Sequence, residues 1–576
     1  MDTFVTERKR MGLVDVLVFI GLVALGFVAV KVVRGMTEGF SLDHQPEVSL
    51  ALGNLPHYAA RSWVRMMVAL AASFVFSIAI GYLAAKNRTA EKLIVPALDI
   101  LQSVPILSFL TFTAPLFLAL LPGSLLGLEA ASIFVIFTSQ VWNMTYAFYH
   151  SLITAPAELD EVVRVYRLGK WHRFLRFELP HTAMPLIWNA MLSISGGWFF
   201  LVASELITVG NQKVHLPGLG SYIGLAIEAG NWGYAAAGIA AILITIVATT
   251  VFITRPLVVW SQKFKYEQEA GERPSHFILG WLERSAMVRV YSRWIGRPMR
   301  RALDWTISLG RAGQKQWATV QQARPEANVA ARWIAVLVFL GLCVYGALVA
   351  LEEVERGFDP NQFWNVVGLG MLTLGRVTVV VIISSIIWVP IGVWIGLQPK
   401  VAEYAQPIIA VLAAFPMNCV YPIAIGLLGL AHFPNWGSIL LLALGAQWYL
   451  LFNIIAYASR IPSDLREASR VLRLTGWTRW KTLILPAVFP GWITGALTAA
   501  GGAWNASIVA EVASWGGQKL EVNGLGRYIA DAFNQQKPDW PALIVGTAVM
   551  TLFVVGINRL LWQPLSQYAE KRFTLE

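Results

Sequence analysis

The sequence predicts an all-α polytopic membrane protein built from two tandem modules of six transmembrane helices each. Three observations predict this fold. The chain of 576 residues is 56% hydrophobic and only 14% charged, whereas soluble proteins carry about 25% charged residues. Many windows of about 20 residues, the length that one helix needs to cross the bilayer core, hold almost no charge. Finally, one charged segment occurs twice, starting at Pro156 and again at Pro462, 306 residues later.

The apolar segments long enough to be transmembrane helices fall into two sets of six. In the first half they are 13–33, 62–85, 93–121, 129–154, 183–209 and 233–260, and in the second 332–350, 366–397, 405–430, 436–458, 488–511 and 540–562. The first segment is followed by Lys31–Arg34 and by no small-residue cleavage site, so it is read as a retained helix rather than a signal peptide.

Basic residues indicate the orientation of these helices, because Lys and Arg concentrate in cytoplasmic loops. With both termini placed in the cytoplasm, the basic clusters fall inside, and the loops 36–60, 210–231, 351–365 and 512–538 fall outside with only scattered single cations. The net charge of +11 therefore reflects membrane topology, not nucleic-acid binding. We expect a multi-pass membrane protein with both termini in the cytoplasm.

A basic segment separates the two halves. The chain divides into a first module (1–260), a cytoplasmic linker (261–331) and a second module (332–576). Trp281, Trp294, Trp305 and Trp317 are interleaved with the linker's Arg and Lys residues. That pattern favours a segment lying on anionic membrane lipid over a separate regulatory domain.

The repeated segment extends into a repeat of the whole module. Residues 156–180 and 462–486 are identical at 11 of 25 positions. The same offset relates Trp198 and Glu205 to Trp504 and Glu511, and an offset of 311 relates further pairs upstream, namely Arg65 with Arg376, Gly81 with Gly392, Pro96 with Pro407 and Pro105 with Pro416. Because each half has an even number of spans, both enter the bilayer in the same direction. They are expected to be related by a pseudo-twofold axis along the membrane normal, with a path between them.

The charged segment itself has the properties of a docking element. Glu161 and Arg164, like Glu467 and Arg470, are spaced i,i+3 and would pair on a helix. Gly169 and Gly476 would end these helices. The result is a short helix pair that would fit a groove on a partner, whereas a single copy could also lie on the membrane surface.

Both copies place Leu-Pro at a fixed distance from the Glu, with Pro180 and Pro486 each nineteen residues after it. This pattern resembles the coupling loop of ABC importer permeases, which have MetI-like modules. The resemblance implies that the loop inserts into a separate ATP-hydrolysing subunit, present in two copies. The implied coupling residues are Glu161, Arg164, Leu168, Gly169, Pro180, Glu467, Arg470, Leu474, Gly476 and Pro486.

Two further features bear on this resemblance. The family has a glycine six residues after the Glu, where this chain has Arg167 and Arg473. The stretch Trp198–Glu205 followed by Pro217-Gly-Leu-Gly220 is similar to the nitrate, sulfonate, taurine and bicarbonate branch of these permeases. The resemblance therefore implies a small anionic substrate, delivered by a periplasmic binding protein.

Polar residues in apolar spans are candidates for the translocation path. They are Arg65, Arg376, Glu205, Glu511, Gln102, Gln140, Asn143, Gln447 and Asn453, together with Pro105 and Pro416, which would break helices near a cavity. The alternatives are interfacial positions for the charged residues and helix–helix hydrogen bonds for the amides.

The sequence lacks the motifs of an enzyme. It has no GxxxxGK[ST] phosphate loop, no HExxH, no GxSxG and no CxxC metal site. We therefore expect a transport subunit without a cofactor or metal of its own, with ATP and Mg on the partner ATPase. A secondary transporter driven by an ion gradient is the main alternative, and a polytopic lipid-linked transferase is the weaker one.

Overall fold

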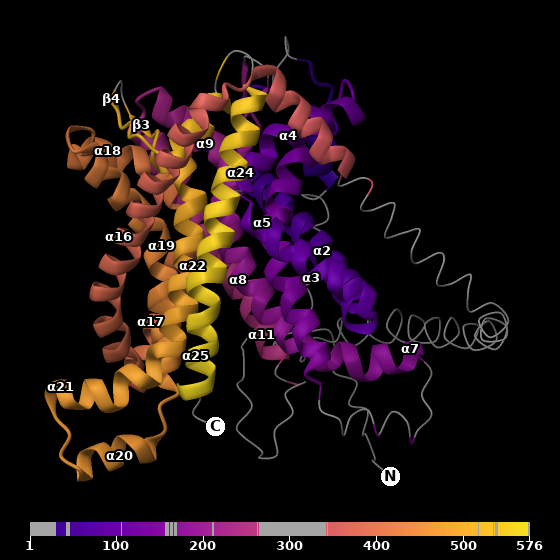
Figure 1. The fold of residues 1–576 in the computed structure, drawn as a ribbon. Helices are drawn as coiled ribbons and strands as arrows, with labels where there is room; N and C mark the ends of the chain where they lie inside the picture. The colour runs from indigo at the N-terminus through magenta and orange to yellow at the C-terminus, as the bar shows by residue number, and fades with distance from the viewer. Residues whose placement is uncertain are drawn as a thin grey trace, which may run out of the picture.

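The protein is a bundle of long helices (Figure 1). The computed structural model describes residues 30–41, 46–104, 106–155, 161, 165, 170–209, 212–261, 263, 341, 344–515, 518–533, 535 and 539–573. The predicted linker 261–331 and the first predicted span 13–33 lie almost entirely outside the described residues, as do residues 156–160, 162–164 and 166–169 of the first charged segment. Of the predicted span 332–350, the structure describes residue 341 and residues 344–350, which are helical.

The first half contributes these elements: η1 (Leu52–Asn54), α2 (Leu55–Lys86), α3 (Arg88–Ser103), α4 (Ile106–Leu120), α5 (Leu126–Ile153), α7 (Lys170–Arg173), η2 (Phe174–Glu178), α8 (Leu179–Glu205), β1 (Leu206–Val209), β2 (Gln212–His215), α9 (Leu219–Glu228), α10 (Trp232–Thr249), η3 (Thr250–Thr254) and α11 (Arg255–Ser261).

The second half repeats this order: η6 (Pro360–Gln362), α16 (Phe363–Gly396), α17 (Pro399–Ala414), η7 (Met417–Cys419), α18 (Tyr421–Leu428), η8 (Leu430–His432), α19 (Pro434–Ser459), α20 (Ser463–Val471), α21 (Gly476–Arg479), η9 (Trp480–Ile484), α22 (Leu485–Ala510), β3 (Ser514–Trp515), β4 (Gln518–Lys519), α23 (Leu525–Phe533), α24 (Trp540–Ile557), η10 (Asn558–Trp562) and α25 (Gln563–Phe573).

The repeat predicted from the sequence reaches into local backbone detail. In the described part of the chain, four five-residue π-helical segments interrupt the long helices, and they occur in equivalent pairs, η2 with η9 and η3 with η10. Each of η2 and η9 stands directly before a Leu-Pro pair that begins the next α-helix. Pro lacks the N–H that the helix ladder needs, and a π-helical turn is one way to accommodate the lost bond. The predicted all-α membrane fold is confirmed.

Among the described residues, seven helices are long and apolar enough to cross a membrane. They correspond to seven of the predicted spans: 62–85, 183–209, 233–260, 366–397, 436–458, 488–511 and 540–562. The predicted span 129–154 is also a single helix, α5. Most of its side chains are buried against α2, α4 and α8, so it lies inside the first half.

The third predicted span of each half is wrong as a single helix. In the first half it is divided between α3 and α4, and in the second between α17 and α18. The residues preceding Pro105 and Pro416 are extended, with ψ of 134° at Val104 and 127° at Phe415. A proline disfavours the helical conformation in the residue before it, so the same proline-directed break occurs twice.

The loops predicted to lie on the outer side of the membrane contain regular secondary structure. The loop 210–231 contains the second strand of an antiparallel hairpin, β2, and the short helix α9. The loop 512–538 contains a whole antiparallel hairpin, β3 with β4, and the short helix α23. Residues 344–357 are helical, so the predicted loop 351–365 begins inside a helix. Apolar positions in these segments are buried, for example Leu219 and Leu525, and tertiary packing therefore overrides the polar, Gly-rich composition.

The two halves interlock at their cores. Ala414 and Cys419, from the break between α17 and α18, are buried in the hydrophobic cluster of the first half. Conversely, Phe199 of α8 packs against the cluster of the second half. Two hydrogen bonds follow the same pattern: Ile106 N donates to Asn505 Oδ1 at 2.9 Å, and Asn418 Nδ2 donates to Phe199 O at 3.4 Å. Phe199 and Asn505 are 306 residues apart, so each broken segment contacts the equivalent position on the other half.

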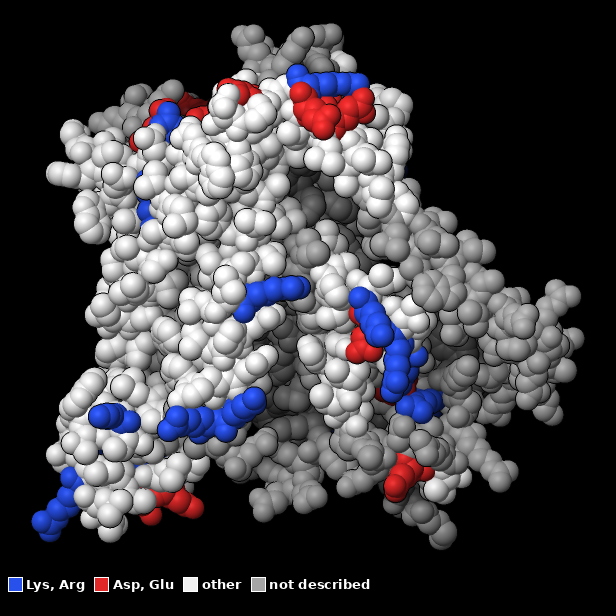
Figure 2. Space-filling model, viewed as in Figure 1, with Lys and Arg blue, Asp and Glu red and all other residues white. Residues whose placement is uncertain are grey.

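The bundle has two distinct ends. One carries the hairpins with α9 and α23, and is called the hairpin end. The other carries α20 and α21, which project beyond the long helices (Figure 1), and is called the α20 end. On the face shown in Figure 2, most Lys and Arg side chains lie toward the α20 end, and the surface below the hairpin end is largely uncharged.

Candidate functional site

A cavity of about 520 Å³ lies between the two halves. Its walls come from α3, α5, α8 and η3 of the first half and from α17, α19, α22, α24 and η10 of the second. Both of the π-helical segments in the last long helices, η3 and η10, reach this wall through Thr250 and Asn558. The described residues that line the cavity include no charged side chain. The side chains that form the wall are aromatic and aliphatic groups, hydroxyls and amides.

The predicted path residues divide between this cavity and other places. Gln102, Asn143 and Asn453 line the cavity. Gln140 is buried and donates to Met66 Sδ at 3.1 Å, while Gln447 accepts a hydrogen bond from Trp388 Nε1 at 2.9 Å. These two amides therefore join helices, as the alternative interpretation held. Pro416 lies at the helix break beside the cavity-lining Ala414, and Pro105 is outside the described residues.

The four charged candidates do not line the cavity. In the first half, Arg65 on α2 is completely buried between two carboxylates. It donates from Nη1 to Glu205 Oε1 at 2.7 Å and from Nη2 to Glu129 Oε1 at 2.7 Å. Arg65 Nη2 also donates to the carbonyl of Pro217 at 3.0 Å. The guanidinium thus ties α2 to α5, to the end of α8 and to the loop before α9.

Glu205 in turn holds the Gly-Leu-Gly turn. Its Oε2 accepts from Gly220 N at 2.6 Å, and Ser62 donates its hydroxyl hydrogen to Oε1. Leu219 N donates to Ser62 Oγ at 3.0 Å. A Cβ at Gly218 would lie 2.3 Å from Glu205 Oε1, so only glycine fits at that position. We call the group Arg65, Glu205, Ser62 and the turn 217–220 the first clamp.

The second half contains the same clamp at equivalent positions. Arg376 Nη1 donates to Glu511 Oε1 at 2.8 Å, and Nη2 donates to Asn523 O at 2.9 Å. Thr373 donates to Glu511 Oε1 at 2.8 Å and accepts from Leu525 N at 2.8 Å. A Cβ at Gly524 would lie 2.2 Å from Glu511 Oε2. This arrangement is the second clamp, and it explains why the Glu and Gly-Leu-Gly residues of the sequence repeat together.

The clamps differ at one pair of positions. The first includes an additional ion pair, in which Arg61 Nη2 contacts Glu129 Oε1 at 2.7 Å. The equivalent residues in the second half are Leu372 and Asn435, and Asn435 accepts from Arg376 Nη2 at 3.1 Å. One cation and one anion are therefore both replaced by neutral residues. Each clamp contains as many cations as anions, as a buried charged group requires.

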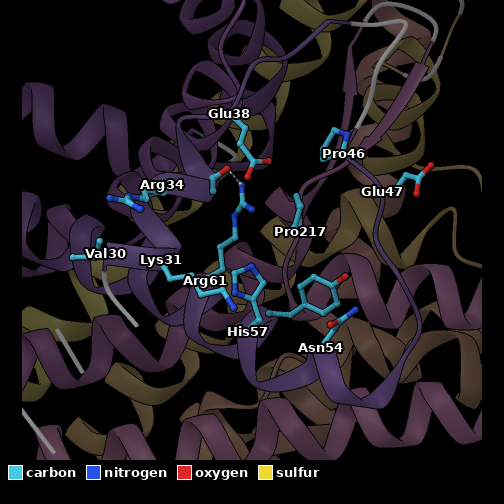
Figure 3. A pocket seen from close by; sticks show the side chains of 12 residues that line it. Val30, Lys31, Arg34, Glu38, Pro46, Glu47, Asn54, His57, Arg61 and Pro217 are labelled. Carbon is cyan, nitrogen blue, oxygen red and sulfur yellow. Dashed lines mark hydrogen bonds between the residues drawn. The ribbon is translucent and has the colours of Figure 1, made fainter. Parts of the chain in front are cut away.

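A second cavity, of about 530 Å³, lies beside the first clamp at the hairpin end. Figure 3 shows Arg61 crossing it, with His57 next to it. A dashed line marks the bond from Arg61 Nη2 to Gly35 O, 3.0 Å long. Lys31, Arg34, Glu38 and Glu47 also line this cavity, so its charges are mixed. It belongs to the first half alone, because Leu372 and Gly368 occupy the positions equivalent to Arg61 and His57.

Close by, Tyr222 of α9 fixes the segment that precedes α2. It donates its hydroxyl hydrogen to Leu50 O at 2.9 Å. Burial, with Tyr234 and Tyr58 nearby, raises the pKa of Tyr222, so the hydroxyl keeps its hydrogen and remains a donor.

The predicted coupling residues of the second half lie on and after α20. Glu467 and Arg470 are exposed on this helix. Val471, Leu472 and Trp477 are 81%, 69% and 72% exposed, so the α20 end presents a large apolar surface beside these charges. The continuous helix from α21 through η9 into α22 then connects this surface to the cavity wall. In the first half, Glu161 is helical and exposed, whereas Arg164, Leu168 and Gly169 lie outside the described residues.

The helix break occurs before the predicted glycine. α20 ends at Val471, and Gly476 instead begins α21. Arg473 has a φ of +51°, while Leu474 N donates to Ser469 O and Arg473 N donates to Arg470 O. These two bonds with a left-handed residue form a Schellman motif, which usually has glycine in that position. Arg473 is also the position, six residues after Glu467, at which the resembled family has glycine.

Sequence reasoning missed several residues of these sites. Arg61, Glu129, Ser62 and Thr373 complete the clamps, and Tyr449 and Asn558 line the cavity. Two signals could have found some of them. Arg61 and Glu129 are ionisable groups at the edges of predicted spans, and Tyr449 is the 306-offset partner of the predicted Asn143.

Comparisons with known proteins agree with this architecture. The family model described as binding-protein-dependent transport system inner membrane component matches residues 77–254 and again 388–563. Each matched range falls inside one half of the chain and includes its charged segment and the helix that follows.

Curated relatives match over part of the chain. A bicarbonate transport system permease protein, CmpB, from Synechocystis is 26% identical over 217 residues, covering 38% of this chain and 71% of the relative. A nitrate import permease protein, NrtB, from the same organism is 29% identical, covering 34% of this chain and 66% of the relative. NrtB from Leptolyngbya laminosa is 27% identical, covering 38% and 70%.

Proposed function

Because the chain belongs to the family of binding-protein-dependent transport system inner membrane components, and is therefore the permease component of an ABC importer, we propose that the cavity between its halves is the translocation path. The observation that carries this proposal is the position of the cavity, since both halves supply equivalent helices to its wall. A path formed at the interface of two modules opens and closes when the modules move relative to each other.

The α20 end is proposed to face the cytoplasm and to dock the ATPase. Three features support this. The exposed Glu467 and Arg470 stand beside the exposed apolar side chains Leu472 and Trp477, which is the composition of a protein interface. Most basic side chains on the face in Figure 2 lie toward this end, as the positive-inside rule requires. The duplicated segment provides two such sites, one for each of two ATPase copies.

The continuous helix from α21 to α22 would carry the ATPase movement to the path. It links the docking surface directly to cavity-lining residues such as Thr494 and Thr498. ATP and Mg would be bound by the partner, and this chain would contribute no catalytic group. At the hairpin end, the clamped turns around 217–220 and 523–526 would present a fixed surface to a periplasmic substrate-binding protein.

The substrate is proposed to be a small anion. This rests on the resemblance to the nitrate, sulfonate, taurine and bicarbonate branch and on the names of the relatives, which include nitrate and bicarbonate permeases. The membrane is proposed to be a bacterial inner membrane, with both termini in the cytoplasm.

A coupling experiment tests the function. In proteoliposomes that contain the chain, its ATPase partner and its binding protein, the double variant Glu161→Ala and Glu467→Ala should lose ATP-dependent uptake while keeping its melting temperature. Glu355→Ala, which removes an exposed carboxylate far from α20, is the matched control and should transport normally. Unchanged uptake by the double variant, or uptake driven by an ion gradient without the ATPase, would contradict the proposal.

A further inference from the structure

The cavity between the halves is much larger than an inorganic oxyanion. Its volume is about 520 Å³. A nitrate or bicarbonate ion occupies roughly one to two times the volume share of a water molecule, ≈ 30 Å³. Pockets of about 300–1,000 Å³ are typical of sites that enclose organic ligands. A cavity of this size would leave an inorganic anion surrounded by water and in contact with only one part of the wall.

The wall is suited to an apolar or flat molecular body. Four tryptophans line it, Trp142, Trp198, Trp504 and Trp562, together with Phe200 and Phe452. No described lining residue carries a charge. An inorganic anion that loses its water on all sides in an uncharged, largely apolar site is strongly disfavoured. An organic anion needs hydrogen-bond donors only at its charged end, and its aromatic body gains free energy by leaving water and contacting aromatic rings.

Most polar side chains on the wall are already hydrogen-bonded within their own helices. Asn189 Nδ2 donates to Pro185 O at 3.0 Å, Asn453 Nδ2 to Tyr449 O at 2.8 Å, and the Thr498 hydroxyl to Thr494 O at 2.8 Å. Such groups have reduced capacity to bind a ligand.

Among the described lining residues, the amide of Asn143 and the hydroxyl of Tyr449 have no hydrogen-bond partner, as is also true of Trp142 Nε1 and of the side chains of Thr254 and Asn558. Asn143 and Tyr449 differ from these three because they occupy equivalent positions in the two halves. Both face the same cavity, from α5 and α19. They occupy equivalent positions in the repeat, 306 residues apart, and therefore approach the cavity from the two halves. Asn143 offers an amide N–H donor and Tyr449 a hydroxyl donor. Such a pair can hold one polar end of a ligand, and it does so without a fixed charge that would hinder release.

From this geometry we propose that the path takes an organic anion with an aromatic or apolar body and a single carboxylate or sulfonate end, in preference to an inorganic oxyanion. The polar end is held by Asn143 and Tyr449, and the body lies against the tryptophans. This inference rests on the proposed function, from which the anionic charge of the substrate is taken.

The test uses the full purified chain in nanodiscs, with sodium benzoate and sodium benzenesulfonate as aromatic probes and sodium nitrate and bicarbonate as inorganic probes. Binding is measured by quenching of tryptophan fluorescence and by the increase in melting temperature that a ligand of the folded state produces. We expect the dissociation constant of at least one aromatic probe to be lower than that of either inorganic probe by about tenfold or more.

Tyr449→Phe and Asn143→Ala should each weaken binding of the aromatic probe, by about tenfold for a lost hydrogen bond to a charged group. Neither should change the melting temperature of the free protein. Tyr421→Phe is the matched control, because Tyr421 is also a buried tyrosine of the second half without a hydroxyl partner but does not line the cavity. It should bind the probe as the wild type does.

Inorganic probes that bind as tightly as the aromatic ones, aromatic probes that do not bind, or Tyr449→Phe and Asn143→Ala variants with wild-type affinity would each overturn the inference. ATP-dependent uptake in proteoliposomes is measured in parallel. Nitrate uptake that requires the ATPase, without binding of aromatic probes, would overturn this inference and leave the proposed function standing. Uptake that does not require the ATPase would instead count against the proposed function.

Discussion

Arg376 and Glu511 form an ion pair inside the protein, with 2.8 Å between Arg376 Nη1 and Glu511 Oε1, and the pair repeats the contact of Arg65 with Glu205. Arg376 is 8% exposed and Glu511 is 0% exposed. Both pairs connect a long helix to the C-terminal end of the fifth predicted span of its half. The repeat therefore conserves a structural tie at the hairpin end, in addition to the docking element at the α20 end.

Removing one member of this pair should strongly destabilise the protein. Arg376→Gln would leave the Glu511 carboxylate buried without its cation, which costs about 3–5 kcal/mol for buried pairs. Thermal unfolding of the purified chain in detergent should show a clear decrease in melting temperature. Arg527→Gln is the matched control, because Arg527 lies on α23 next to the second clamp. Arg527 pairs with Glu521 and Asp531 at the surface, and exposed pairs contribute about 1 kcal/mol at most. Equal melting temperatures for both variants would contradict this view of the clamp.

The Gly-Leu-Gly turns lie very close to the buried carboxylates. We therefore predict that adding a single methyl group to the first glycine of such a turn destabilises the protein. Gly524→Ala would place a Cβ 2.2 Å from Glu511 Oε2, which forces the turn away from the carboxylate and breaks its backbone bond to Arg527 N. We expect a loss of about 1–3 kcal/mol, as for other overpacked sites. Gly375→Ala is the control, because a Cβ there meets nothing within 4 Å and alanine is the better helix former. It should be neutral or stabilising, and a wild-type melting curve for Gly524→Ala would disprove the fit.

The left-handed conformation of Arg473 predicts a stabilising substitution. An L-residue in this region costs roughly 1–2 kcal/mol relative to glycine, part of which the greater freedom of glycine in the unfolded chain offsets. Arg473→Gly should therefore increase the hydrogen-exchange protection of amides in α20. Arg470→Gly, inside the same helix, should decrease it by about 1 kcal/mol. If both variants lost protection, the assignment of the Schellman motif would be wrong.

Cys419 offers a native probe of movement between the halves. Its thiol is 3% exposed, and it lies at the helix break of the second half within the hydrophobic cluster of the first. In a Cys343→Ser background, we expect maleimide to label Cys419 slowly in the resting transporter. Labelling should accelerate during ATP turnover by the complete complex, because separation of the halves exposes the break. Full labelling in denaturant is the control, and a rate that ATP leaves unchanged would exclude movement at this contact.

Much of the fold could be predicted because its causes are local. The low charge and the length of the apolar segments predict the long helices, and the offset of 306 residues predicts the repeat, although not the paired π-helical turns within it. The breaks at Pro105 and Pro416 were expected from the prolines. What was not expected is that the segments on either side of each break form separate helices, each too short to cross the bilayer, because apolar composition alone does not show whether a proline bends a helix or ends it.

The candidate site was harder to predict because its members are distant in sequence. Glu205 and Arg65 were both recognised as unusual charges in apolar surroundings. Their contact with each other, and with Glu129, depends on how α2, α5 and α8 pack. Likewise, Gln140 and Asn143 are three residues apart on one helix, yet one joins helices and the other faces the cavity. Only tertiary packing distinguishes two amides of such similar sequence context.

The replacement of Arg61 and Glu129 by Leu372 and Asn435 in the second half has a consequence for how such a protein can evolve. In an assembly of two identical subunits, every substitution appears on both sides of the axis, so a change useful on one side must also be harmless on the other. Tandem duplication within one polypeptide removes that condition. Each copy of the ancestral unit can then diverge alone, and the two faces shown to the solutes and proteins on either side of the bilayer need not match.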